Sequence, residues 1–328
     1  MFKIIRYAAL VFLCAVAFGV VGAQEDEKVT VNANLVSVNV SVTDSHGRYV
    51  RGLSGGQFEL FDDGMKQRVA HFSADDAPFS LGVVYDMHPT TREHAAAVLG
   101  ALKQFVGALR REDDFFLLVF DERGSATVGF VPTAEQIGGH LAYVPPREPN
   151  SLYDAVYLAA EELRSRPRAK RALLVISDGI DHGSRHGYGE LRRKVAEFDV
   201  QLYGISTTGR DGGARAGAGR WAYEELTRRV GGRSPSGAAE DSYGRAVLEE
   251  MARASGGASY SPLTESEGEL SDIFARVALE VRRQYTVGFY PAAATGYARR
   301  HKILVRVKQS DGAGRLRLSY RESYRPRT

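Results

Sequence analysis

Two apolar stretches stand out in the middle of the chain, and Ala172 to Ile176 in the second have no polar break. Residues 79–86 read FSLGVVYD and residues 171–179 read RALLVISDG, so each run leads to an aspartate, Asp86 and Asp178. A short apolar run that does not alternate, and that turn residues bound, predicts a strand buried on both faces. Such strands lie in the middle of parallel sheets, whose carboxyl ends carry ligand sites. The two aspartates therefore predict a shared cation site.

Helical patterns alternate with further strands between residues 78 and 284. Helices are expected at residues 92–109, 153–164, 190–198, 246–255 and 267–283, and strands at 115–120, 127–131, 201–206 and 258–260. Thr90 with Glu93, and Ser151 with Asp154, have the spacing of capping boxes at the first two helices. This alternation predicts an α/β domain with a doubly wound, mostly parallel sheet flanked by helices.

Both ends of the chain have β patterns. Valines at every second position from Val36 to Val42 alternate with polar residues, which predicts a half-buried antiparallel strand. Other β segments are expected near residues 58–61, 68–72, 285–290, 303–307 and 316–320. Neither end has enough strands to bury a core alone. We therefore expect residues 24–77 and 285–328 to form one smaller β-sandwich-like module, with the α/β domain of residues 78–284 inserted between them.

Two polar regions are interpreted as surface structure. Between residues 207 and 245, glycine and arginine replace the apolar periodicity, which predicts a flexible surface insertion; a partner-binding loop is the alternative. Asp44, Asp62 and Asp63 stand in the turn sequences DSHG and DDG. We interpret them as turn residues and not as calcium ligands, because turn-forming aspartates are far commoner.

The first 23 residues have the features of a secretory signal peptide. Lys3 and Arg6 precede an apolar run, and small residues end it before Gln24. We expect cleavage there, with an uncleaved anchor as the alternative, and no membrane span in the mature protein. The only cysteine, Cys14, lies in this segment, so disulfides and thiol chemistry are not expected in the mature chain. Loss of the two cationic residues lowers the formal charge from +3 to +1, which indicates no particular partner. The protein is expected to be secreted or periplasmic.

Three motifs in sequence order resemble a von Willebrand factor A domain. They are YD-x-H-x-T with Asp86, His88 and Thr90, then NSLYDA at residues 150–155, then LLVISDG at residues 173–179. The similarity is greatest to the secreted bacterial type known as VWFA-related, of the acidobacterial kind. It covers residues 78–285 closely and the flanks more loosely. It implies the same α/β fold and a non-enzymatic role in binding proteins.

The resemblance also implies a metal-ion-dependent adhesion site. In the family, an Asp-x-Ser-x-Ser sequence after the first strand, a threonine from a later loop and the aspartate of the SDG-type strand hold the ion. The corresponding residues here are Asp86, His88, Thr90, Asn150 and Asp178, with Ser151, Asp181 and His182 as possible additional ligands. His88 and Asn150 depart from the family pattern. Imidazole favours Mn²⁺ or Zn²⁺ over Mg²⁺, so we expect weak Mg²⁺ binding at a degenerate site.

Enzymatic chemistry has little support. The sequence contains no phosphate-binding loop with its lysine and no Gly-x-Ser-x-Gly nucleophile elbow. His182 and His186 have a spacing that zinc sites use on helices, but glycines make this segment a loop. We therefore expect an exported binding protein that contacts an unidentified protein or envelope component, and not nucleic acid, at the carboxyl-end face of the sheet. The alternatives are a scaffold with no metal dependence and, with less support, a metal-dependent hydrolase.

Overall fold

The structure is a computed structural model. It describes residues 35–74, 76–87, 94–121, 124–130, 151–166, 168–181, 183–207, 238–291, 299–308 and 315–325. The expected signal peptide and residues 208–237 of the expected insertion lie outside the described residues. Residues 34–328 form one compact unit. Among the described residues, no helix combines the length and apolarity that a membrane crossing needs.

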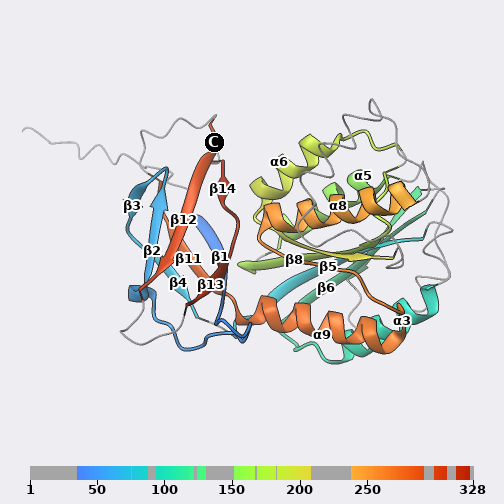
Figure 1. The fold of residues 1–328 in the computed structure, drawn as a ribbon, viewed down its shortest axis with the longest axis horizontal. Coiled ribbons are helices and arrows are strands. Elements are labelled where there is room, and N and C mark those ends of the chain that lie inside the picture. The colour runs from blue at the N-terminus through green and yellow to red at the C-terminus, as the bar shows by residue number, and fades with distance from the viewer. Residues whose placement is uncertain are drawn as a thin grey trace, which may run out of the picture. The chain divides into compact units, whose positions relative to one another are not determined.

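The α/β domain is built on a six-stranded sheet of order β10-β9-β8-β5-β6-β7 (Figure 1). Its strands are β5 (Phe79–Asp86), β6 (Asp114–Asp121), β7 (Gly124–Phe130), β8 (Lys170–Ser177), β9 (Gln201–Ser206) and β10 (Ser259–Tyr260). All neighbouring strands are parallel except the pair of β6 with the edge strand β7. The chain starts in the middle at β5 and proceeds first to one side and then, from β8, to the other. This is the doubly wound arrangement that the sequence predicts.

Helices cover both faces of this sheet (Figure 1). The helices are α3 (Ala95–Gly107) and α9 (Glu267–Arg283) on one face, and α5 (Leu152–Arg164), α6 (Tyr188–Phe198) and α8 (Ala238–Ser255) on the other. On β5, Val83 and Tyr85 face the first layer and Val84 faces the second. The unbroken apolar run of this strand follows from that double burial.

Both ends of the chain build a second module of two antiparallel sheets. One sheet has the order β13-β1-β11-β4 and the other β14-β12-β2-β3. The strands are β1 (Val36–Thr43), β2 (Phe58–Asp62), β3 (Met65–Gln67), β4 (His71–Ser73), β11 (Tyr285–Phe289), β12 (His301–Val307), β13 (Arg317–Ser319) and β14 (Ser323–Tyr324), with a short 3-10 helix, η1, at Gly55–Gln57. Val38 from one sheet and Leu60 from the other belong to the same buried core. The expected β-sandwich-like module formed by both ends is confirmed.

Two helices begin three or more residues away from the start that the sequence predicts. Helix α3 starts at Ala95 and not at residue 92, and α8 starts at Ala238, eight residues before the predicted start at 246. The early part of α8 contains Gly244, which weakens the helical pattern. A Cβ atom at Gly244 would lie 1.9 Å from the carbonyl oxygen of Asp178. The glycine is required by this close approach of α8 to the turn after β8.

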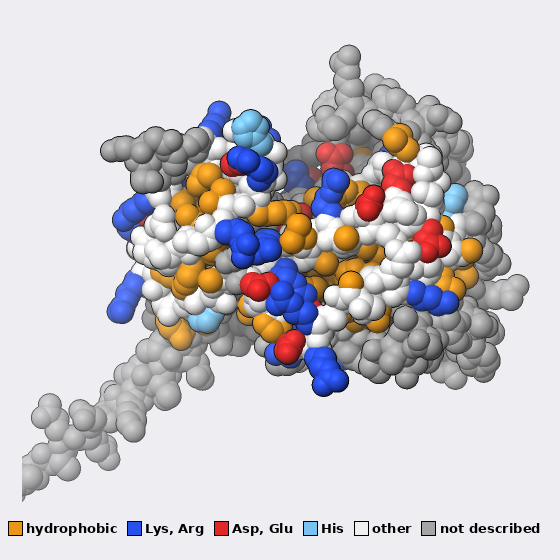
Figure 2. Space-filling view, turned by 90° about the horizontal axis from the view of Figure 1, so that it is seen from below, with side chains coloured by type: hydrophobic (Ala, Val, Ile, Leu, Met, Phe, Trp, Pro, Cys, Tyr) orange, Lys and Arg blue, Asp and Glu red, His pale blue; other side chains and the backbone are white. Residues whose placement is uncertain are grey.

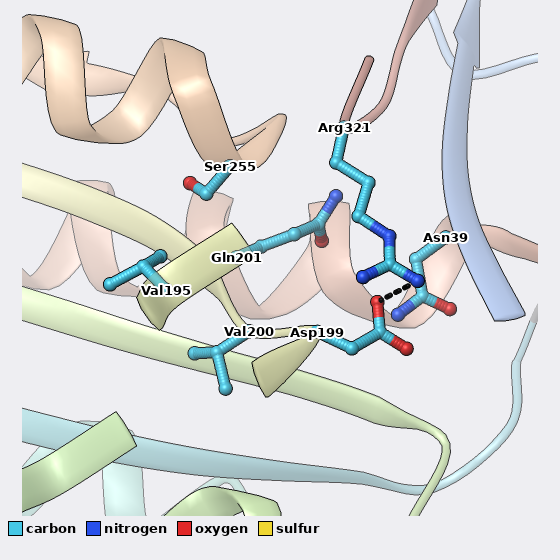
Figure 3. Close-up of a pocket in the computed structure, with 7 residues that line it drawn as sticks. All are labelled: Asn39, Val195, Asp199, Val200, Gln201, Ser255 and Arg321. Atoms are coloured by element: carbon cyan, nitrogen blue, oxygen red, sulfur yellow. Dashed lines mark ion pairs between the residues drawn. The ribbon is translucent and has the colours of Figure 1, made fainter. Parts of the chain in front are cut away.

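Polar contacts join the β module to the α/β domain. The guanidinium of Arg321, which follows β13, lies 3.3 Å from the carboxylate of Asp199, the residue that ends α6. Asn39 of β1 donates from Nδ2 to the carbonyl oxygen of Ala169 at 3.3 Å. Figure 3 shows Arg321 and Asp199 facing one another beside Asn39, around a small cavity of about 10 Å³ that Gln201 also lines.

A second contact between these parts is a buried network around Glu280 of α9. Ser41 of β1 donates to the Glu280 carboxylate at 3.4 Å, and Gln284 donates from Nε2 to Ser41 Oγ and to the Tyr203 hydroxyl, each at 3.2 Å. Burial raises the pKa of Glu280, and hydrogen bonds from the hydroxyls of Tyr203, Tyr49 and Ser41 offset this only in part. A carboxylate at this position therefore costs folding free energy at neutral pH.

Charged side chains of both signs share the surface. On the face shown in Figure 2, Lys and Arg side chains lie beside Asp and Glu side chains across the described part. A nucleic-acid-binding surface instead concentrates positive charge on one face or stripe. The described part of this face carries charges of both signs and not of one sign alone.

Candidate functional site

Two of the predicted ligands lie at the carboxyl ends of the central strands. Asp86 is the last residue of β5, and Asp178 directly follows β8. Strands β5 and β8 are parallel neighbours with Tyr85 paired to Ile176, so Asp86 lies level with Ser177. Ser177 donates from Oγ to Asp86 Oδ2 at 2.8 Å. The side chains of Asp86 and Asp178 are both buried.

The strand order places these aspartates where the direction of winding reverses. The chain passes from β5 to β6 on one side and from β8 to β9 on the other. In doubly wound sheets, the loops that leave the two central strands diverge at this point, and ligands bind in the resulting crevice. Two buried acids at this position form the candidate site.

The turn Ser177-Asp178-Gly179 fixes the second carboxylate. The Gly179 N–H donates to Ser177 Oγ at 3.0 Å, and the Ile180 N–H donates to Asp178 Oδ1 at 2.9 Å. Gly179 has φ +82°, and a Cβ atom there would lie 2.1 Å from the carbonyl oxygen of Gly244. Only glycine fits both the backbone conformation and the space. Strand β8 and helix α8 thus hold Asp178 in place together.

The donor set suits the cation that the fold implies. Asp86 and Asp178 offer carboxylate oxygens, which are hard donors of the kind that Mg²⁺, Ca²⁺ and Mn²⁺ take. Ser177 and the Ile180 N–H orient these carboxylates, as residues outside the ligand set do at metal sites.

The other predicted ligands are placed only in part. His88, Thr90, Asn150 and His182 lie outside the described residues. Ser151 is the N-cap residue of α5, but its side chain makes no capping hydrogen bond. The predicted capping box of Ser151 and Asp154 is therefore wrong; the predicted box of Thr90 and Glu93 falls on undescribed residues.

Residues from the loop after β8 cap helix α5 instead. Asp181 Oδ1 accepts from the Tyr153 N–H at 3.1 Å, and Ser184 Oγ accepts from the Asp154 N–H at 3.0 Å. Ser184 also donates from Oγ to Asp181 Oδ1 at 2.5 Å. Asp181, predicted as a possible ligand, therefore satisfies the start of a helix that lies about thirty positions earlier in the chain.

A carboxylate and an imidazole that the sequence analysis did not pair lie in the same loop region. Asp154 Oδ1 lies 2.6 Å from His186 Nδ1, and the His186 ring stacks on Tyr157 with ring centroids 4.2 Å apart. Burial would raise the pKa of Asp154, but hydrogen bonds from Arg185 and His186 outweigh it, so the pKa lies below its usual value. This pair holds the loop to α5. No local pattern joins residues 32 positions apart.

A further acidic group lies in the β module. Among the described residues, Asp62, Asp63 and His301 are a group whose donor atoms all lie within 4.8 Å of one another and could hold a metal ion. From the sequence, the two aspartates are expected to be turn residues. His301 reaches them only through the pairing of β2 with β12.

The strand order, the helix layers and the acids after β5 and β8 define a von Willebrand factor A-type fold. Comparison with family models gives no match, and comparison with curated proteins gives none either. Among solved structures, an aerotolerance-related membrane protein from Bacteroides fragilis is 13% identical with a TM-score of 0.43, over 62% of this chain and 98% of that chain. BatB from Bacteroides thetaiotaomicron is 15% identical with a TM-score of 0.39, over 61% and 97%. The SpRpn10 VWA domain is 9% identical with a TM-score of 0.35, over 62% and 98%. Likenesses of this degree concern the fold alone.

Proposed function

We propose that this chain is an exported, non-enzymatic protein that binds another protein or an envelope component at the carboxyl-end face of its central sheet. The observation that carries the proposal is the pair of buried carboxylates, Asp86 and Asp178, at the carboxyl ends of the two strands where the sheet reverses its winding. A bound cation there would coordinate an acidic group of the partner. The Ser177 hydroxyl beside them donates to Asp86 and accepts from the Gly179 N–H, so it orients the carboxylate.

Residue types in the undescribed loops set the expected ion preference. His88 stands where the family has a serine, and Asn150 where it has a threonine. Neutral imidazole and amide groups add no charge to hold a hard cation, and imidazole favours borderline ions. We therefore propose weak Mg²⁺ binding and tighter binding of Mn²⁺ or Zn²⁺ at this site.

A scaffold role without metal is the second candidate. It is favoured by the hydrogen bonds of Asp154 and Asp181, because two acids of this loop region serve its internal structure. In that role the sheet and the β module would mediate assembly, and the aspartates after β5 and β8 would be remnants of an ancestral site.

A pull-down from envelope extract, with the mature chain as bait, separates the two candidates. The wild type and Asp178→Asn are compared in Mn²⁺, in Mg²⁺ and in EDTA. We expect a partner that is retained in Mn²⁺ and lost both in EDTA and with the variant. Asp272→Asn serves as the matched control, since Asp272 is exposed on α9 and should leave capture unchanged. Equal capture under all conditions would support the scaffold and contradict the cation-dependent proposal.

A further inference from the structure

A histidine lies between two aspartates in the β module, far from the sheet site. Asp62 ends β2, Asp63 begins the turn to β3, and His301 is the first residue of β12. His301 Nδ1 lies 3.2 Å from Asp62 Oδ1 and 3.2 Å from Asp63 Oδ2. The antiparallel pairing of β2 with β12 creates this arrangement, because it places Ile303 opposite Asp62.

The imidazole is buried against these acids. The side chains of His301 and Asp62 are 3% and 2% exposed, whereas that of Asp63 is 30% exposed, so the group opens to solvent on one side. Nε2 of His301 has no hydrogen-bond partner among the described residues. Its Nδ1 is therefore directed into a pair of carboxylates while the rest of the ring makes no polar contact. Two adjacent carboxylates and a buried imidazole are a donor set that suits a divalent metal ion.

Neighbouring groups orient both carboxylates. The Tyr324 hydroxyl donates to Asp62 Oδ2 at 2.9 Å, and the Lys302 N–H donates to Asp63 Oδ1 at 2.9 Å. Each carboxylate thus turns its other oxygen toward His301 Nδ1. Hydrogen bonds of this kind hold the ligands at metal sites. Arg299 lies 2.5 Å from Asp63 Oδ2 and would have to leave, but its side chain is 71% exposed and the ion pair is correspondingly weak.

The distances fit a metal of zinc size. Zinc lies about 2.0 to 2.2 Å from nitrogen and oxygen ligands, so two ligands are separated by about 2.8 to 3.1 Å at octahedral angles and about 3.3 to 3.6 Å at tetrahedral angles. Both separations from Nδ1 are 3.2 Å. We propose that Asp62, Asp63 and His301 form a site for a divalent ion of the Zn²⁺ class, with water completing the coordination on the exposed side of Asp63.

The site would join the two ends of the chain. Its aspartates belong to the hairpin of β2 and β3, whereas its histidine and Tyr324 belong to the C-terminal strands. Closing a loop of this length restricts the unfolded chain strongly, so the ion would stabilise the folded module. This site is independent of the function proposed above.

The test is a zinc titration of the full chain by calorimetry after chelator treatment, together with thermal melting with and without ZnCl₂. Asp63→Asn is the main variant, because Asp63 has φ +47°, a conformation that asparagine tolerates. His301→Gln is the second variant. Both variants are also made in the Asp178→Asn background, which removes a carboxylate of the sheet site. In that background we expect one zinc ion whose affinity falls at least about tenfold in each variant, and a rise in melting temperature with zinc that each variant loses.

Two controls locate the bound ion. Asp44→Asn changes another turn aspartate of the same module, and Asp178→Asn changes the sheet site; both should keep the zinc-dependent rise in melting temperature. An Asp63→Asn protein that binds zinc as tightly as the wild type would overturn the proposal. A wild type that binds no zinc would also overturn the proposal. The same holds if zinc binding is lost only in Asp178→Asn. If only the sheet site binds no metal, this proposal is unaffected. If only the site in the β module binds no zinc, the proposed function is unaffected.

Discussion

Substitution of Gly179 by alanine tests how the candidate site is held. The residue has φ +82°, and an added Cβ atom would lie 2.1 Å from the Gly244 carbonyl oxygen. Left-handed backbone costs an alanine about 1 to 2 kcal/mol. The clash is with backbone and not with a flexible side chain, so β8 and α8 must separate, and overpacking of this kind costs about 1 to 3 kcal/mol. We expect Gly179→Ala to lower the free energy of unfolding by about 2 to 5 kcal/mol.

Gly47→Ala is the matched control, because Gly47 has φ +78° but nothing within 4 Å of its added Cβ atom. It should show only the backbone cost of about 1 to 2 kcal/mol. Urea unfolding followed by circular dichroism measures both variants, and calorimetric titration with Mn²⁺ measures the site. Gly179→Ala should also weaken Mn²⁺ binding, since the turn carries Asp178. Equal losses of stability in the two variants would refute the argument that close packing of α8 fixes this turn.

Two further predictions concern the contacts between the β module and the α/β domain. Because burial raises the pKa of Glu280 above its unfolded value, stability linked to this group is fully present below the unfolded pKa and is lost as the pH rises through the folded pKa. Glu280→Gln should therefore unfold less readily than the wild type at pH 7 and lose this advantage near pH 4; parallel pH profiles in urea melts would contradict it. Arg321→Gln should destabilise the fold by about 2 to 4 kcal/mol, because it removes the cationic partner of the Asp199 carboxylate, whose side chain is only 14% exposed. In the double variant with Asp199→Asn the two losses should not add, and full additivity would show that the pair does not interact.

Local patterns predict the elements of this fold well where burial follows a simple rule. The apolar run of β5 identifies a strand buried on both faces. The alternating valines of β1 locate a strand correctly, but the predicted half-burial is wrong, because Asn39 and Ser41 are also buried where β1 contacts the α/β domain. The insertion of one module in the other follows from counting strands, since neither end can bury a core alone. The acids Asp86 and Asp178 were found because they end such strands.

The sequence predictions fail where the contact partner of a residue lies far away along the chain. Helix α5 is capped from residues about thirty positions later, so the Ser151–Asp154 pattern suggests a capping box that does not form. Gly244 looks like a helix breaker although it is required by contact with Asp178. His301 meets Asp62 across 239 positions, and its own surroundings in sequence contain no sign of this. These contacts arise from tertiary packing between distant parts of the chain, so a short segment of sequence does not reveal them.

The construction of one module from both ends of the chain affects the order in which the protein can fold. Strand β1 pairs with β11 and β13, and β2 pairs with β12 and β3. Three of these four partner strands follow the inserted domain in the chain, so they are synthesised after it. The inserted α/β domain is complete before these late strands leave the ribosome or an export channel. Until then, the first strands expose unpaired edges that can aggregate. A chain truncated before residue 285 would therefore keep its inserted domain intact while its N-terminal strands remain open for chaperones or proteases.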